Sequence, residues 1–260
     1  MRTLAAIAAV SLAALAACTT MDATPATHAT ARAAIDAALA DSARGAEMTA
    51  LDDGRKPAET LAFLGLQPGM DAADLFTGSG YWAQIMARVV APSGSVTAFE
   101  PAQFYKGEGK TKIDALVASL PATTLTTFPF EGFTAPAGAF DFALINLNYH
   151  DLYWESAKYG IGRSDPAAFT RNLYAAMRPG GVVGVIDHVG PAGDTRAIVE
   201  KSHRIDPATV RADFERAGFK LEAQSDLLAN PADDHTLGVF DPAIRGKTDR
   251  FLYKFRKPRR

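Results

Sequence analysis

Histidines and aspartates that can transfer protons lie in three short polar segments of this chain. The segments are NLNYHD (146–151), DH (187–188) and HRID (203–206). A histidine beside a carboxylate is a common pairing for general acid–base chemistry near neutral pH. We therefore predict catalytic roles for His150, Asp151 and His188. We predict substrate contacts for Asp187 and His203.

The same residue types are ligands for zinc or iron, so these segments have a second interpretation. No two histidines stand at the close spacing of a helical metal-binding motif. Because that signature is missing from the sequence, we expect no metal ion. A third interpretation is structural, since a single Asp or His after a strand often caps a helix or fixes a loop.

A glycine turn lies in the segment DLFTGSGYW, residues 74–82, between an apolar run and a helix-like segment. Gly78 and Gly80 can adopt positive φ angles and let the backbone approach a ligand closely. The helix start that follows offers free N–H groups to an anionic group. Asp74 beside the turn favours a cationic ligand, and Glu100, which ends the next apolar run, can accept hydrogen bonds from two ribose hydroxyls.

Apolar runs alternate with amphipathic segments through most of the chain. Nearly continuous apolar runs are typical of strands buried on both faces by helices. We predict strands at residues 71–76, 95–100, 123–128, 140–147 and 181–188. We predict helices at 31–42, 81–90, 112–120, 166–177 and 207–218, with Asp165 and Asp206 as N-caps of the last two.

The end of the chain departs from this alternation. Two strand-like segments, residues 219–228 and 250–257, are separated by a stretch rich in Pro, Asp and Gly that is typical of a surface loop. Without a crossover helix, these two strands must pair antiparallel. The sequence thus predicts an α/β fold with a doubly wound, Rossmann-like, mostly parallel seven-stranded sheet and a C-terminal antiparallel hairpin strand.

Over about residues 55–258 the chain resembles the class I S-adenosylmethionine-dependent methyltransferases. Asp74, Gly78 and Gly80 match the family's first motif, with Phe76 in place of its first glycine, and Glu100 matches the acid that ends the second strand. The segment MRPGGVVGVID (177–187) is similar to the family's helix-Pro-Gly-Gly-strand segment. RKPAE (55–59), NYHD (148–151), IDH (186–188) and HRID (203–206) resemble a bacterial group called predicted methyltransferases, which usually have no assigned substrate.

The resemblance implies S-adenosylmethionine as the cofactor and methyl transfer to an acceptor that the sequence does not name. It implies a donor site made of Asp74, Phe76, Thr77, Gly78, Ser79, Gly80, Glu100 and Asn146. Tyr81 and Tyr149 directly follow strand-end turns and Arg55 precedes a helix-like segment, so we predict that these three contact the substrate. Because the donor is already activated, the protein must mainly align the acceptor and exclude water.

The glycine turn has two other interpretations. Gly78, Gly80 and Ala83 also satisfy the relaxed dinucleotide fingerprint, with Glu100 as the ribose acid, which is the pattern of an NAD-binding oxidoreductase. Against this, Asp74 would repel a pyrophosphate, and a reversed terminal hairpin is not part of the usual dinucleotide-binding strand order. The turn could also serve only the close packing of helix on strand.

The first residues resemble a bacterial lipoprotein signal. An apolar run from Leu4 to Ala17 is too short as a helix to span a hydrocarbon layer, and Leu15-Ala16-Ala17-Cys18 resembles a lipobox. We predict a signal peptide at residues 1–17, cleavage before Cys18, lipidation of its thiol and a periplasm-facing membrane anchor. Residues 18–30 are predicted to form a flexible tether, and residues 31–260 the methyltransferase-like domain.

The net charge and the predicted location limit which classes of partner we expect. A formal net charge of −2 gives no basic surface for nucleic acid, so we expect a small-molecule substrate and no nucleic-acid partner. The methyl donor is made in the cytosol and is too highly charged to cross a bilayer unaided. A non-catalytic envelope lipoprotein that binds an adenosyl-like ligand, or one with a structural role, is therefore the remaining alternative.

Overall fold

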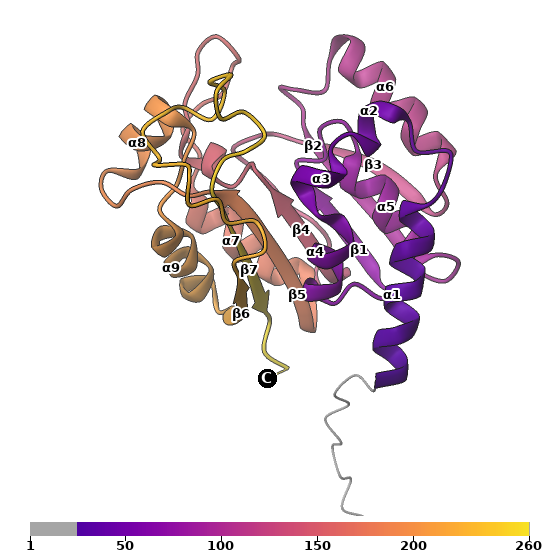
Figure 1. The fold of residues 1–260 in the computed structure, drawn as a ribbon. Coiled ribbons are helices and arrows are strands. Elements are labelled where there is room, and N and C mark those ends of the chain that lie inside the picture. Colours follow the sequence, from indigo (N-terminus) through magenta and orange to yellow (C-terminus); the bar gives the residue numbers. More distant parts are fainter. Residues whose placement is uncertain (1–24, 260) are drawn as a thin grey trace, which may run out of the picture.

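The computed structural model of the protein describes residues 25–259, with side chains from Ala29 onward. Within this part of the chain, one seven-stranded sheet carries helices on both faces (Figure 1). The predicted signal peptide, Cys18 and the first part of the predicted tether lie outside the described residues. No helix in the described part is long and apolar enough to cross a membrane.

The sheet has the predicted architecture. Its strands are β1 (Asp71–Leu75), β2 (Ser95–Pro101), β3 (Thr123–Phe128), β4 (Phe140–Asn146), β5 (Met177–His188), β6 (Lys220–Ser225) and β7 (Arg250–Arg256). The order is β3-β2-β1-β4-β5-β7-β6, with β1 to β5 parallel and β7 antiparallel to both its neighbours. The strand order reverses between β1 and β4, and such a switch point is where open α/β sheets bind their ligands.

The helices largely follow the sequence pattern. They are α1 (Pro25–Leu39), α2 (Ala46–Thr49), α3 (Asp52–Arg55), α4 (Pro57–Leu64), α5 (Tyr81–Val90), α6 (Gly107–Ser119), the 3₁₀ helix η1 (His150–Tyr153), α7 (Pro166–Ala176), α8 (Thr195–Ser202) and α9 (Pro207–Ala217). Asp165 and Asp206 are N-caps as predicted, since their side chains accept hydrogen bonds from the backbone N–H groups of Ala167 and Ala208. Helix α8 was not predicted.

The tether prediction needs a correction at its end. Helix α1 begins at Pro25, inside the range 18–30 that was predicted to be flexible. The alanines of this segment favour a helix, and Ala31, Ile35 and Ala38 are buried against the domain. The buried residues of α1 thus lie in the predicted helix from residue 31 onward, which docks on α4 and α5 and begins earlier than predicted, at Pro25.

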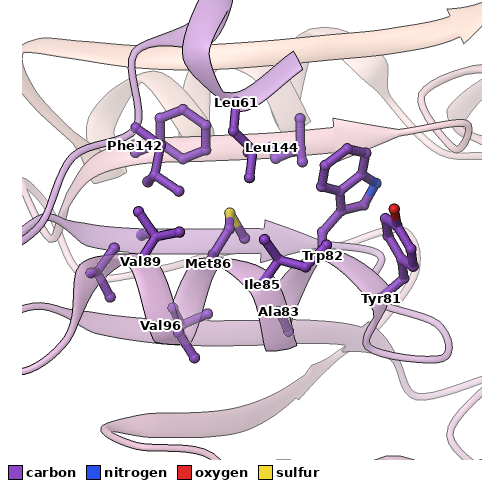
Figure 2. Close-up of a cluster of buried hydrophobic side chains, with 14 of the residues drawn as sticks. Leu61, Tyr81, Trp82, Ala83, Ile85, Met86, Val89, Val96, Phe142 and Leu144 are labelled. Carbon is purple, nitrogen blue, oxygen red and sulfur yellow. The ribbon is translucent and has the colours of Figure 1, made fainter. Parts of the chain in front are cut away.

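Helix α5 fixes the position of the glycine turn that precedes it. Every residue of this helix except Arg88 is buried. Figure 2 shows Ile85, Met86 and Val89 of α5 in a cluster with Leu61 of α4 and Leu144 of β4. Burial of each large side chain of this kind contributes about 1.5–3 kcal/mol. The turn at residues 77–80 is thus mounted on a rigid strand and a rigid helix.

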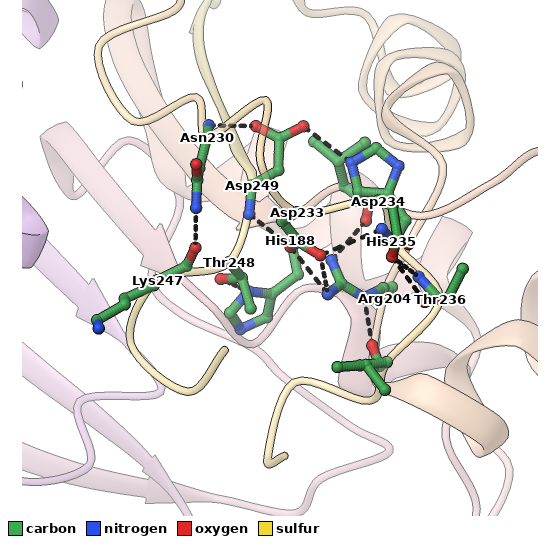
Figure 3. Close-up of polar contacts among 12 residues, drawn as sticks. His188, Arg204, Asn230, Asp233, Asp234, His235, Thr236, Lys247, Thr248 and Asp249 are labelled. Carbon is green, nitrogen blue, oxygen red and sulfur yellow. Dashed lines mark hydrogen bonds and ion pairs between the residues drawn. The ribbon is translucent and has the colours of Figure 1, made fainter. Parts of the chain in front are cut away.

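The stretch between β6 and β7 is a loop, as predicted, but it is not confined to the surface. Asp233, Val239 and Thr248 of this loop are buried. Arg204, which is fully buried, donates two hydrogen bonds of 2.9 Å to the carboxylate of Asp233, and its other N–H groups donate to the carbonyls of Val189 and Leu237 (Figure 3). This network holds the loop against the carboxyl end of β5.

Candidate functional site

Asp74 holds the glycine turn onto the start of α5. Its Oδ2 accepts hydrogen bonds from the hydroxyl of Thr77 at 2.7 Å and from the backbone N–H of Ala83 at 2.9 Å. Burial raises the pKa of Asp74 to about 7, even though these two donors favour its anion. Its second oxygen, Oδ1, has no hydrogen-bond partner among the described residues. Asp74 is therefore a turn-shaping residue with one unused acceptor.

The two glycines of the turn differ in what surrounds them. Both have positive φ angles, 55° at Gly78 and 79° at Gly80. A Cβ on Gly80 would lie 2.5 Å from Leu116 and 2.7 Å from Ile113 of α6, so Gly80 is needed for helix packing. A Cβ on Gly78 would meet nothing closer than the Phe76 carbonyl at 3.9 Å. Gly78 therefore borders open space, where a ligand can approach the backbone.

Phe76 and Thr77 do not face this open space, which corrects their prediction as donor-binding residues. Phe76 has a φ of 58° like the glycine it replaces, but its ring packs in the core, 5.5 Å from the ring of Phe128. The Thr77 hydroxyl donates to Asp74, and its backbone N–H donates to the carbonyl of Phe99 at 2.9 Å. Both residues shape the turn, and Ser79 alone presents an exposed side chain there.

Glu100 lies beside the turn with one carboxylate oxygen in use. Oε2 accepts a hydrogen bond from the backbone N–H of Gly78 at 2.8 Å, while Oε1 has no partner in the part of the chain that the structure describes. Burial raises the pKa of Glu100 above its usual range. An open cavity of about 370 Å³ lies just beyond the ends of β2 and β3, lined by Ala102, Gln103, Thr127, Phe128 and Pro129.

The structure brings the predicted histidines and carboxylates together at the ends of β4 and β5. The carboxylate of Asp187 accepts the backbone N–H of His150 at 2.8 Å and lies 2.7 Å from the ring Nδ1 of the same residue. The ring of His150 lies 5.8 Å from that of His188 and 5.6 Å from that of His203, between ring centres. Asp187 is fully buried, so its role is to position His150 and not, as predicted, to contact a substrate.

Asp151 lies between two of the histidines. Its Oδ1 is 3.4 Å from Nε2 of His150 and 3.7 Å from Nδ1 of His203, while Oδ2 accepts a hydrogen bond from the Asn148 amide at 3.1 Å. Burial alone would lower the pKa of His150, but the carboxylates of Asp187 and Asp151 outweigh it and raise that pKa to about 9. The ring of His150 is therefore a positive charge between the carboxylates of Asp187 and Asp151.

His188 is in a different environment. Its Nδ1 lies 2.7 Å from the hydroxyl of Thr248, and its Nε2 has no partner among residues 25–259. Burial and then the neighbouring charge of His150 lower the pKa of His188 well below its ordinary value. Thr248 was not anticipated from the sequence, since it lies in the loop between β6 and β7 with nothing local to mark it.

Tyr149 is not a substrate contact, which corrects another prediction. It is fully buried, and its hydroxyl donates a hydrogen bond to Asp213 at 2.9 Å. Asp213 also accepts from the hydroxyl of Tyr153. The sequence carries one signal for this role, because Asp213 stands on the buried stripe of α9 between Val210 and Phe214. A carboxylate at such a position needs a buried hydrogen-bond donor.

Tyr81 is covered by the segment that contains α2 and α3. Its hydroxyl donates to Asp52 at 2.6 Å, and the guanidinium of Arg55 lies 4.2 Å above its ring. Arg44 donates to the same Asp52 carboxylate, and Met48 contacts Ser79 through its sulfur at 3.9 Å. The side chain of Arg55 makes no hydrogen bond within the described residues, and burial lowers its pKa. Arg55 is thus a cation next to the turn that contacts the ring of Tyr81 and has no anionic hydrogen-bond partner among the described residues.

The turn and the histidine cluster share one edge of the sheet. β1 pairs with β4 and β4 with β5, all parallel, so the ends of these strands lie side by side. Neighbouring strands are about 4.8 Å apart, which places the end of β5 about 10 Å from the end of β1. Between them Asn146 ends β4 half-buried, and Leu147 turns the chain with a φ of 61°. Strained residues of this kind gather at functional sites.

Comparison with known proteins gives a partial match to one family model and a fold. A sequence model of the protein-L-isoaspartate(D-aspartate) O-methyltransferase family (PCMT) matches residues 27–120 of the 260-residue chain, which is less than half of it. The match contains the glycine turn and Glu100 but ends before β4, so it includes none of the histidine cluster. No curated protein sequence gives a significant match.

Solved structures resemble nearly the whole domain. A SAM-dependent methyltransferase from Aquifex aeolicus is 18% identical with a TM-score of 0.55, and the alignment covers 81% of this chain and 97% of that one. One from Mesorhizobium loti is 16% identical with a TM-score of 0.56, covering 79% of this chain and 99% of that one. The [4+2]-cyclase SpnF is 17% identical with a TM-score of 0.51, covering 84% of each chain.

These likenesses concern the fold. A cyclase among the similar structures shows that one scaffold supports more than one reaction, so the reaction has to be inferred from the site. The described part of this chain has the Rossmann-like α/β fold of S-adenosylmethionine-dependent methyltransferases, with a mostly parallel seven-stranded sheet and antiparallel C-terminal strands.

Proposed function

We propose that the protein is an S-adenosylmethionine-dependent methyltransferase that acts on a small-molecule acceptor. The observation that carries this proposal is the arrangement of Gly78 and Glu100. The backbone of Gly78 borders open space, and Glu100 is fixed by that backbone through Oε2 while Oε1 stays free. A free carboxylate oxygen beside a glycine turn suits the ribose of a ligand that is bound at the turn.

The residues around the turn fit the chemical groups of this donor. When bound, S-adenosylmethionine supplies an activated methyl group on a positively charged sulfur. Glu100, and Asp74 when it is ionised, give the site negative charge for that cation, and the guanidinium of Arg55 suits the methionine carboxylate. The segment with Met48 contacts Ser79 at the border of the turn. An NAD pyrophosphate would instead lie next to two carboxylates.

The acceptor side is assigned to the histidine cluster on the same edge of the sheet. His188 is the best placed general base, because Thr248 holds its Nδ1 and its Nε2 is free. In the tautomer that donates from Nδ1 to Thr248, Nε2 can take the proton that the acceptor loses on methylation. His150 is instead held between two carboxylates, so we do not assign the base to it.

Calorimetric titration of the purified protein tests this function. We expect S-adenosylmethionine and S-adenosylhomocysteine to bind and NAD not to bind. Transfer of a labelled methyl group to a metabolite extract is then expected to depend on His188. Binding of NAD without a response to the other two ligands would overturn the proposal, and donor binding without any transfer would leave a ligand-binding protein with a methyltransferase fold.

We also propose that the mature protein begins at Cys18 and is anchored to the envelope membrane by lipid on that residue. The support is the sequence Leu15-Ala16-Ala17-Cys18 after an apolar run. Fractionation of cells that produce the wild-type protein or Cys18→Ser tests it. We expect the wild type in the membrane fraction and an unprocessed or released Cys18→Ser variant. Identical distribution and mass of the two proteins would contradict the anchor.

A further inference from the structure

Three side chains of the histidine cluster point ligand atoms at a common space. His150, Asp151 and His203 each offer one ligand atom, and these three atoms lie within 4.8 Å of one another. The three residues come from two segments. His150 and Asp151 are the first residues of η1 after β4, and His203 is the C-cap of α8. Nitrogen and carboxylate ligands in this combination are those of zinc and other divalent transition metals.

The spacing of these atoms matches a metal site. Bonds of 2.0–2.1 Å in tetrahedral geometry put two ligand atoms about 3.4 Å apart. Oδ1 of Asp151 lies 3.4 Å from Nε2 of His150 and 3.7 Å from Nδ1 of His203. The second distance is too long for a hydrogen bond.

The atoms that do not face this space are held by other residues. Asp187 holds Nδ1 of His150, which leaves Nε2 to face Asp151. The Asn148 amide donates to Oδ2 of Asp151, which leaves Oδ1 to face both histidines. A buried carboxylate behind a histidine ligand fixes its tautomer and orientation in known zinc sites. In this cluster, Asp187 is the buried carboxylate behind His150.

His203 supplies an independent observation. Its Nδ1 is buried and has no hydrogen-bond partner among the described residues. The residue has a left-handed backbone, with a φ of 51°, and its ring is 5.0 Å from the rings of both Trp154 and Phe240. The ring is thus fixed with an unsatisfied nitrogen aimed at Asp151. A buried polar atom of this kind needs a partner.

We propose that His150, Asp151 and His203 bind one divalent transition metal ion, with zinc preferred, and leave its fourth position open. The sequence left a metal site as an alternative and did not favour it, because the ligands are brought together by the fold and not by a local motif. Calcium and magnesium prefer sites made of oxygen ligands, and two imidazoles select against them. If the proposed methyl transfer is correct, the open position would take an acceptor with a hydroxyl or thiol group, and this last step rests on that function.

Titration of zinc chloride into the purified, chelator-treated protein tests the site. We expect one zinc ion per chain, no heat with magnesium chloride, and absorption typical of tetrahedral coordination when cobalt(II) replaces zinc. His203→Ala should weaken zinc binding more than about 100-fold, beyond the 10–100-fold effect typical of residues behind the ligands. His235→Ala is the matched control, since this histidine pairs with Asp249 outside the cluster, and it should bind zinc like the wild type.

Circular dichroism of each variant shows whether it is folded. Equal zinc affinity in the folded His203→Ala variant and the wild type, or no zinc binding by the folded wild type, would overturn the inference. His150→Ala provides a second variant should His203→Ala not fold. Titration of S-adenosylhomocysteine on the same metal-free protein keeps the two proposals apart. Zinc binding without nucleoside binding would contradict only the proposed function. Nucleoside binding without zinc binding would contradict only the metal site.

Discussion

Asp187 at the end of β5 contacts His150 after β4 in two ways. Its carboxylate accepts a hydrogen bond from the backbone N–H of His150 at 2.8 Å and lies 2.7 Å from the ring Nδ1. Because Asp187 is fully buried, this pair sets where the His150 ring lies for any chemistry at this edge of the sheet. The same carboxylate also accepts the backbone N–H of His188 at 2.8 Å. One side chain thus positions both of these histidines.

Asp187→Asn should keep the shape of this contact and remove its charge. We expect a loss of about 1–3 kcal/mol in the free energy of unfolding, because a charged buried hydrogen bond becomes neutral. We also expect zinc affinity to fall about 10–100-fold, as is typical when a residue behind a metal ligand is changed. Urea unfolding with a chelator present, and zinc competition with an indicator dye, measure the two effects. Unchanged zinc affinity would show that Asp187 does not position a metal ligand.

Comparing Gly78→Ala with a control variant separates the loss of ligand binding from the cost of backbone strain. Gly138 is the matched control, since its φ of 62° is close to the 55° of Gly78, no atom lies within 4 Å of its Cβ position, and it precedes β4 at the opposite edge of the sheet. Each substitution should cost about 1–2 kcal/mol in stability for a left-handed alanine. Only Gly78→Ala should weaken S-adenosylhomocysteine binding, as measured by calorimetry. Equal affinities for the two variants would place the ligand elsewhere.

Glu100→Gln tests the ribose contact. The amide can still accept the Gly78 N–H but presents no charged acceptor to a ribose, so we expect donor affinity to fall by about 1–3 kcal/mol, the effect of losing a charged hydrogen bond. Glu200→Gln on the exposed face of α8 is the control and should bind like the wild type. Should both variants keep wild-type affinity for S-adenosylhomocysteine, Glu100 is not on the ribose.

Asp74→Asn should change how stability depends on pH. Burial raises the pKa of Asp74 to about 7 in the folded protein, above its ordinary value of 3.8. The folded state therefore holds a proton that the unfolded chain releases, so this stabilisation is present below about pH 4 and is lost as the pH rises through about 7. The asparagine variant cannot ionise and should be more stable than the wild type at about pH 8. Urea unfolding at about pH 5 and about pH 8 measures this, and parallel curves for the two proteins would contradict the raised pKa.

The strands and most helices of this protein could be predicted because their signals are local. The apolar run 71–76, for example, corresponds to β1 at Asp71–Leu75, and the missing crossover helix before residue 250 correctly implied an antiparallel β7. The rule that parallel strands bind ligands at their carboxyl ends then placed the turn and the histidine cluster on one edge. Local patterns and topology were sufficient for this much.

The roles of individual side chains within the site could not be predicted in the same way. Tyr149 meets Asp213 across 64 residues of sequence, and His188 meets Thr248 across 60, so nothing near either residue indicates its partner. The phenylalanine at position 76 keeps the backbone of a glycine while its ring joins the core. The metal ligands likewise converge only after β4 and α8 have folded together.

A crystal structure of the protein with S-adenosylhomocysteine tests the central claim most directly. The account predicts that the ribose hydroxyls lie within hydrogen-bond distance of the Glu100 carboxylate and that the amino-acid part lies over the turn at residues 77–80, next to Gly78. A nucleoside bound at another place, or no bound nucleoside at saturating concentration in a folded protein, would contradict it.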